Sequence, residues 1–190
     1  MNKGLFSAPN LFTMLRIVLV PVLVIAFYFP LNGGHSIAAA IFVLAAISDW
    51  LDGYLARRMQ LSSRFGAFLD PVADKILVAI ALVLLVSDPN LYYITIPSTI
   101  IIGREIIVSG LREWMAEIGK RASVAVSFVG KAKTACQMLS IVLLLYCHAG
   151  VDLWLQRAGV ILLYAAAVLT LWSMVMYLKA AWKDLLASAE

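Results

Sequence analysis

Charged residues are scarce in this chain. Lys, Arg, Asp and Glu make up only 14% of its 190 residues, whereas 63% are hydrophobic, and the mean hydropathy is +0.94. A soluble globular domain typically has about 25% charged residues. The composition therefore excludes an ordinary soluble domain and predicts an integral membrane protein. No stretch resembles a linker, a low-complexity segment or an internal repeat, so residues 1–190 are expected to form a single domain.

Cysteine and histidine are also rare, with two residues of each. Cys136 and Cys147 fall on one expected helix, roughly 16 Å apart along its axis, which is too far for a disulfide. Both are therefore expected to be packing residues. His35 and His148 fall in short loops, far from the acidic stretch described below. Because structural and catalytic zinc sites are built mainly from these two residue types, the sequence disfavours zinc.

Long apolar runs alternate with short polar segments, and most of the runs are long enough to cross a bilayer. They predict an all-α polytopic membrane protein with six transmembrane helices. Trp154, Tyr177 and Trp182 fall near helix ends, as in an aromatic belt at the membrane surface. The expected helices cover about residues 10–30, 36–58, 65–86, 91–118, 131–147 and 155–178.

Apart from Arg16, Lys75 and Arg104, which fall deep within expected helices, the basic residues gather at one set of helix ends. The opposite set offers only Arg157. By the positive-inside rule, both termini are expected to be cytoplasmic. The net charge of +4 is thus explained by its role in setting the membrane topology and by attraction to an anionic membrane surface, and no nucleic-acid partner is expected. The basic set is Lys3, Arg57, Arg58, Arg64, Arg112, Lys120, Arg121, Lys131, Lys133, Lys179 and Lys183.

One stretch concentrates acids between two apolar runs, with carboxylates at Asp49, Asp52, Asp70 and Asp74. Ionisable groups at membrane depth are costly, so such a cluster is by default a functional site. A local charge near −4 must be neutralised in a low-dielectric site. Divalent cations neutralise it better than protonation does, and hard carboxylate oxygens suit Mg²⁺ or Mn²⁺.

The spacing of these acids brings them to one region. Asp49 and Asp52 are neighbours on one helix face, and Asp70 and Asp74 are neighbours on the next helix. If residues 59–63 form a turn, the two helices run antiparallel. Asp52 then lies roughly 8 Å above Arg57, and Asp70 roughly 9 Å above the start of its own helix. The acids are therefore expected to meet at matching depths.

Two glycines and an arginine accompany the acids. Gly53 and Gly66 remove side chains beside them, and Arg57 is able to pair with a phosphate. Acids, small residues and arginine together favour a diphosphate held by two cations. The alternatives are a water-filled ion path and a structural salt-bridge cluster. Lys75, the only base at similar depth in this stretch, does not balance four acids.

The full pattern is Asp49-x-x-Asp52-Gly53-x-x-Ala56-Arg57, eight residues, then Gly66-x-x-x-Asp70-x-x-x-Asp74. It resembles the signature of the CDP-alcohol phosphatidyltransferases, with every defined position filled. The resemblance implies that Asp49, Asp52 and Asp70 ligate a pair of divalent cations, with Asp74 as a further ligand or as the catalytic base. It also implies nucleotide binding by Gly53, Ala56, Arg57 and Gly66, joined by Asn10 and Thr13 from the first helix.

The first helix opens with Asn10, Thr13 and Arg16 at intervals of three residues. One interpretation is a helix cap at Asn10 and an arginine that extends to the membrane surface. The other is a polar face that points into the acidic site. Pro9-Asn10-x-x-Thr13-x-x-Arg16 is similar to the way this family begins, which favours the second interpretation.

Further bases fit an anionic acceptor. Arg104 falls inside the fourth apolar helix, roughly 12 Å before Arg112, with Glu105 as a candidate partner. Lys131 and Lys133 open the fifth helix, where membrane-edge anchoring is an equally good explanation. Arg104-Glu105 and Gly130-Lys131-x-Lys133-Thr134 resemble the branch of the family that uses glycerol 3-phosphate. We therefore expect Arg104, Arg112, Lys131 and Lys133 to hold the acceptor phosphate, the arginines through bidentate forks.

The resemblance implies transfer of a phosphatidyl group from CDP-diacylglycerol to glycerol 3-phosphate at the cytoplasmic face of the cell's inner membrane. Three alternatives remain open at this point. They are a relative with another acceptor (inositol phosphate, serine or a lipid), a membrane prenyltransferase, and a metal-cation transporter. Small residues on apolar helix faces also make a homodimer an expectation.

Overall fold

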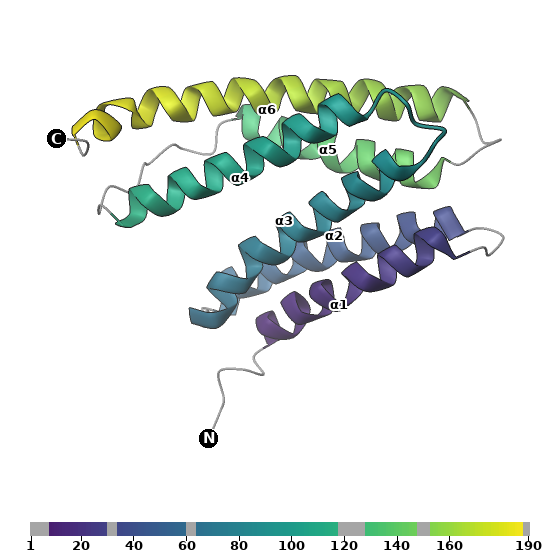
Figure 1. Ribbon diagram of the computed structural model, residues 1–190. Coiled ribbons are helices and arrows are strands. Elements are labelled where there is room, and N and C mark those ends of the chain that lie inside the picture. The colour runs from purple at the N-terminus through teal and green to yellow at the C-terminus, as the bar shows by residue number, and fades with distance from the viewer. Residues whose placement is uncertain (1–7, 30–33, 60–63, 118–127, 148–152, 188–190) are drawn as a thin grey trace.

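The computed structural model describes residues 8–29, 34–59, 64–117, 128–147 and 153–187 (Figure 1). Within these ranges the side chains of residues 8–12, 50, 52–59, 64–68, 70–71, 128–129, 180–181 and 183–187 are not described. The described residues form six helices, which confirms the all-α class. The helices are α1 (Ala8–Tyr28), α2 (Gly34–Met59), α3 (Arg64–Ser87), α4 (Thr95–Glu117), α5 (Phe128–Tyr146) and α6 (Leu153–Ala187).

Two helix boundaries differ clearly from the expectation. The fourth helix begins at Thr95 and not near residue 91, because Asp88 organises a turn before it. The Asp88 carboxylate accepts hydrogen bonds from the backbone N–H and the side-chain amide of Asn90, both at 2.9 Å, while Leu91 and Ile94 are buried in the core. The sixth helix continues to Ala187 and not to residue 178. No glycine or proline follows Gly159, so nothing in the sequence ends the helix earlier.

The helices form two groups. In the first, α1 packs against both α2 and α3, whereas α2 and α3 make few direct contacts with one another. In the second, α6 packs against α5 and α4, and contacts between α2 and α5 join the groups. Figure 1 shows that α1 and α3 begin, and α2, α4 and α6 end, at the same side of the molecule, on the left. The simple α2–α3 hairpin expected from the sequence is therefore completed by α1.

The core is aliphatic and runs through both groups. Its fully buried members include Leu23, Phe42, Leu85, Ile141 and Leu163. Close packing of α5 on α6 depends on Gly159, whose backbone C=O accepts a 2.7 Å hydrogen bond from the Ser140 hydroxyl. A Cβ at Gly159 would lie 2.9 Å from Cγ and Cδ2 of Leu144, a side chain that is fully buried. Cys136 and Cys147 form no disulfide, as the sequence predicts.

Gly159→Ala is expected to destabilise the protein, because the added methyl group must displace Leu144 inside a closed core. Overpacking of this kind costs about 1–3 kcal/mol. The matched control is Gly110→Ala on α4, where a Cβ meets nothing within 4 Å. There, loss of glycine flexibility should stabilise the helix by about 0.5–1 kcal/mol. Thermal unfolding of both variants in detergent measures the difference, and an equal or higher melting temperature for Gly159→Ala would contradict the packing.

Large apolar side chains cover the outer faces of the helices, among them Val18, Leu44, Val83, Ile106 and Ile161. Among the described residues, one helical segment, Leu153–Lys179 (27 residues), is long and apolar enough to cross a membrane, and its most apolar 18-residue window has a mean hydropathy of 2.1. Thr13–Tyr28 and Gly34–Asp49 are shorter apolar helices. On α6, the exposed rings of Trp154 and Trp182 are about 42 Å apart along the axis, which matches a bilayer with its headgroups.

Candidate active site

Three helices meet at a buried arginine. Arg16 on α1 is only 1% exposed, and its Nη1 donates to Oδ1 of Asp49 on α2 at 2.7 Å. The same nitrogen also donates to Oδ1 of Asp74 on α3. Both carboxylates are about half exposed, at 45% and 47% of their side-chain surface. We call Arg16, Asp49 and Asp74 the acidic subsite, in which one guanidinium joins two acids from separate helices.

The position of α1 explains this convergence. Asp49 and Asp74 lie at equal sequence distances from the linked ends of α2 and α3, so the two acids have the same depth. That part of the sequence-based geometry is confirmed. Thr13, one turn before Arg16, is also buried, so the polar face of α1 points into the protein. The interpretation of Arg16 as an arginine that extends to the membrane surface is wrong.

The other residues expected here lie outside the described side chains. They are Asn10, Asp52, Gly53, Ala56, Arg57, Gly66 and Asp70, and their assigned roles remain predictions. Among the side chains that are described, no group of three His, Cys, Asp or Glu residues gathers in a way that could hold a metal ion. Asp49 and Asp74 nevertheless offer hard oxygen donors from two helices at one point, already shared with one cation, Arg16. This donor set fits Mg²⁺ or Mn²⁺.

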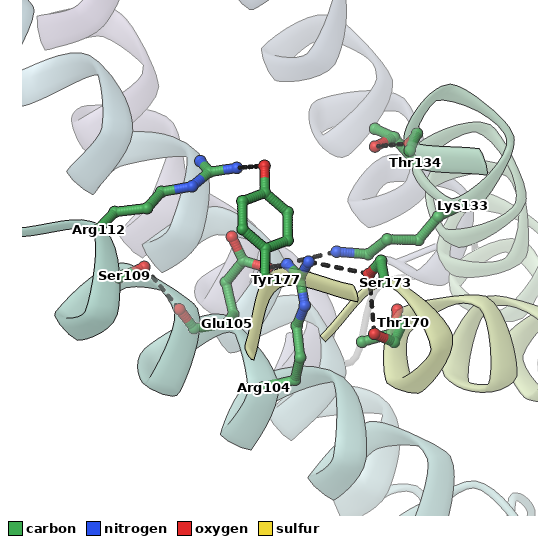
Figure 2. Close-up of polar contacts among 10 residues, drawn as sticks. Arg104, Glu105, Ser109, Arg112, Lys133, Thr134, Thr170, Ser173 and Tyr177 are labelled. Carbon is green, nitrogen blue, oxygen red and sulfur yellow. Dashed lines mark hydrogen bonds and ion pairs between the residues drawn. The ribbon is translucent and has the colours of Figure 1, made fainter. Parts of the chain in front are cut away.

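A second group of polar residues lies between α4, α5 and α6 (Figure 2). Arg104 is buried, with 8% of its side chain exposed, and its Nη1 lies 3.3 Å from Oε2 of Glu105. The same carboxylate oxygen lies 3.4 Å from Nζ of Lys133 on α5, which is also buried. Arg104 Nη2 donates a 2.9 Å hydrogen bond to the Ser173 hydroxyl on α6, which in turn donates to the backbone C=O of Thr170.

Tyr177 on α6 connects the two arginines of α4. Its hydroxyl accepts a 2.5 Å hydrogen bond from Nη2 of Arg112. Its ring centroid lies 4.9 Å from Cζ of Arg112 and 6.0 Å from Cζ of Arg104. Figure 2 shows the ring standing between the two guanidinium groups. The expectation that Tyr177 belongs to the aromatic belt stays a prediction, and the structure adds that this half-buried ring contacts both cations.

We call Arg104, Glu105, Arg112, Lys133 and Tyr177 the basic subsite. Its interacting charges comprise three bases and one acid, which leaves an excess of positive charge around two buried cations, Arg104 and Lys133, with Arg112 exposed at the edge. Within the described residues, Arg104 Nε is buried without a hydrogen-bond partner, and so is the Thr170 hydroxyl one turn before Ser173. An excess of positive charge together with hydrogen-bond donors that have no partner is typical of an anion-binding site.

The structure separates the two lysines of the expected acceptor site. Lys133 lies inside the basic subsite, whereas Lys131, two residues earlier, is exposed on another face of α5. No hydrogen bond or ion pair joins Lys131 to the described residues of the basic subsite. Sequence reasoning did not place Tyr177 and Ser173 here, because their roles depend on α6 packing against α4. No signal in the sequence of α6 alone marks them.

Known proteins are similar to this chain over nearly its whole length. A family model described as CDP-alcohol phosphatidyltransferase matches residues 6–172. A CDP-diacylglycerol–glycerol-3-phosphate 3-phosphatidyltransferase from Salmonella choleraesuis is 54% identical over 181 residues, which cover 95% of this chain and 98% of the relative. The protein of the same description from Escherichia coli is 53% identical with the same coverage.

Proposed function

This chain belongs to the CDP-alcohol phosphatidyltransferase family, and we propose that it transfers a phosphatidyl group from CDP-diacylglycerol to sn-glycerol 3-phosphate. The products are phosphatidylglycerol phosphate and CMP, and the reaction is a step of phospholipid biosynthesis. Identity of more than half over 95% of the chain with enzymes of that description supports the assignment. In the structure, the observation that carries the choice of acceptor is the basic subsite, whose three bases outnumber its one acid.

Family membership makes the enzyme metal-dependent, and we assign two divalent cations, Mg²⁺ or Mn²⁺, to Asp49, Asp52, Asp70 and Asp74. When bound, they would act as Lewis acids that screen the diphosphate and stabilise the departing CMP. The chain's own contribution is the placement of these acids. Arg16 holds one oxygen of Asp49 and one of Asp74, which limits the rotation of both carboxylates.

Asp74 also supplies the base. Because Arg16 holds Oδ1, we assign Oδ2 as the atom that accepts the proton of the acceptor hydroxyl. The freed oxygen attacks the phosphorus on the lipid side of the diphosphate. A new P–O bond forms to the glycerol, the P–O bond to CMP breaks, and CMP leaves with the bridging oxygen. The nucleotide half of the donor is assigned to Gly53, Ala56, Arg57, Gly66, Asn10 and Thr13.

The acceptor phosphate is assigned to Arg104, Arg112 and Lys133. Arg104 is held by Ser173, and Arg112 by Tyr177, so both guanidinium groups are oriented before the ligand arrives. Such preorganisation lowers the entropic cost of binding. Lys131 is exposed at the start of α5, where it would attract the acceptor from solution or contact anionic lipid.

An acceptor panel tests the choice of substrate. Purified enzyme is supplied with CDP-diacylglycerol labelled in its lipid half and with glycerol 3-phosphate, glycerol, inositol phosphate or serine. The proposal predicts a labelled lipid product with glycerol 3-phosphate and none with glycerol, which lacks the phosphate that the basic subsite binds. Product formed only with a different alcohol would keep the family and overturn the acceptor assignment.

We also propose that the single domain spans the inner membrane six times, with both termini and the active site on the cytoplasmic side. The ends of α2, α4 and α6 lie at one side of the molecule (Figure 1), and in the sequence most of the basic residues fall near these ends or near the starts of the helices that alternate with them, which supports this topology by the positive-inside rule. The homodimer stays a prediction that chemical cross-linking in membranes would test.

Cysteine labelling tests this topology. Tyr92, in the turn before α4, and Trp182, near the end of α6, are both exposed and lie on opposite sides of the proposed bilayer. In a background without Cys136 and Cys147, Tyr92→Cys should react with a membrane-impermeant maleimide in intact spheroplasts. Trp182→Cys should react only after the membrane is permeabilised. The reverse pattern would invert the topology.

A further inference from the structure

We propose that Arg16 makes the filling of the acidic subsite by divalent cations depend on the diphosphate of the CDP-linked lipid. This inference rests on the proposed function, since it concerns the same metals and the same donor. It assigns Arg16 a role as a positioning residue and charge sensor, in addition to its contacts with Asp49 and Asp74.

The guanidinium already occupies the place where the carboxylates converge. A single nitrogen, Nη1, donates to Oδ1 of both acids, and the side chain is only 1% exposed. Cations that bind to these acids therefore enter beside a positive charge. Repulsion between them weakens cation binding, because solvent screens the charge of the buried Arg16 poorly even though both carboxylates are about half exposed.

Arg16 has no easy way to leave. It lies within α1, and α1 packs against both α2 and α3, whereas those two helices touch each other little. Withdrawal of the guanidinium would break both of its contacts with the acids and would move a side chain that is only 1% exposed. The guanidinium is therefore expected to stay in the site while cations bind, so that the repulsion persists.

The sum of the charges in the site then determines whether two cations bind before the lipid donor or only together with it. The four acids of the motif carry four negative charges, and Arg16 reduces their sum to three. Two divalent cations would overcompensate this sum and leave the site positive. The diphosphate of the lipid donor brings two further negative charges and removes the excess. Without Arg16, the same acids would neutralise two cations before any donor arrived.

The expected result is a coupling between the two ligands that depends on Arg16. Binding of Mn²⁺ to the purified full-length protein in detergent is followed by electron paramagnetic resonance, with and without CDP-diacylglycerol and without acceptor. In the wild-type protein the donor should tighten Mn²⁺ binding by about ten- to a hundredfold, within the usual range of coupling between two ligands. By linkage, Mn²⁺ should tighten donor binding by the same factor.

Arg16→Met should bind Mn²⁺ more tightly than the wild type when no donor is present, and its gain from the donor should fall below about fivefold. Arg157→Met is the matched control, since Arg157 is an exposed arginine at the other end of the bundle. Its coupling should equal that of the wild type. Arg16→Lys keeps the charge and should retain coupling, which also covers the case in which the methionine variant does not fold.

A packing role alone would lower stability and leave the coupling unchanged. An Arg16→Met protein with the same gain from the donor as the wild type would therefore overturn the inference and leave the proposed reaction intact. Wild-type protein that binds no Mn²⁺ even with the donor would overturn the metal site itself. The two failures are thus distinguished by the wild-type titration.

Discussion

Asp74→Asn is expected to abolish turnover while largely preserving the fold. The asparagine has the same shape, and its Oδ1 is still able to accept from Arg16 Nη1, so α1 and α3 remain joined. It loses the charge and the oxygen that accepts the acceptor's proton. General bases of this kind contribute roughly 10²- to 10⁴-fold to the rate, and kcat should fall by at least this range.

The rate of CMP release at saturating substrates measures the effect. Asp88→Asn is the matched control, because Asp88 is a buried carboxylate that serves only the turn before α4. Its variant should keep the wild-type kcat. If a higher concentration of Mn²⁺ or Mg²⁺ restored the activity of the Asp74→Asn variant, Asp74 would be a metal ligand and not the base. A variant with wild-type kcat would exclude both roles.

The second large effect is expected from Arg104→Met, which removes one of the two buried cations of the basic subsite. Loss of one partner from a buried, hydrogen-bonded charge pair costs about 2–4 kcal/mol. This corresponds to an increase of about thirty- to several-hundredfold in the KM for glycerol 3-phosphate. The KM for CDP-diacylglycerol should stay near its wild-type value, since the donor is assigned to the acidic subsite.

Steady-state kinetics with each substrate varied in turn separates these effects. Arg157→Met, the same substitution at an exposed position, should leave both KM values unchanged. Tyr177→Phe removes only the hydroxyl that accepts from Arg112 and keeps the ring, so its effect on the same KM should be smaller. An Arg104→Met enzyme with an unchanged KM for glycerol 3-phosphate would place the acceptor elsewhere.

The part of the candidate site that was predicted correctly came from the spacing of the acids in the sequence. Helical periodicity placed Asp49 and Asp74 at one depth, and the structure joins both to one nitrogen. Apolar runs predicted all six helices of the described chain, because long apolar runs separated by short polar segments are strong local signals. The end of α6 was predicted too early, since basic residues were read as the end of a helix that contains no breaker.

Contacts between distant helices account for what the sequence did not predict. The spacing of Arg16 identified a polar face but not its partners, which lie on α2 and α3. From the sequence, Tyr177 was expected only as a residue of the aromatic belt. Its contact with Arg112 depends on the packing of α6 against α4, which the sequence does not show. The sequence alone does not distinguish Lys131 from Lys133. Only the orientation of α5 about its own axis leaves Lys131 exposed and Lys133 buried.

The most direct test of the whole account is CMP release by purified protein in detergent, with CDP-diacylglycerol and Mg²⁺, in the presence and absence of glycerol 3-phosphate. The account predicts release that depends on both the cation and glycerol 3-phosphate, with phosphatidylglycerol phosphate formed in equal amount. Folded protein that releases no CMP with any alcohol would contradict it, and the two subsites would then have to be explained as binding or transport sites.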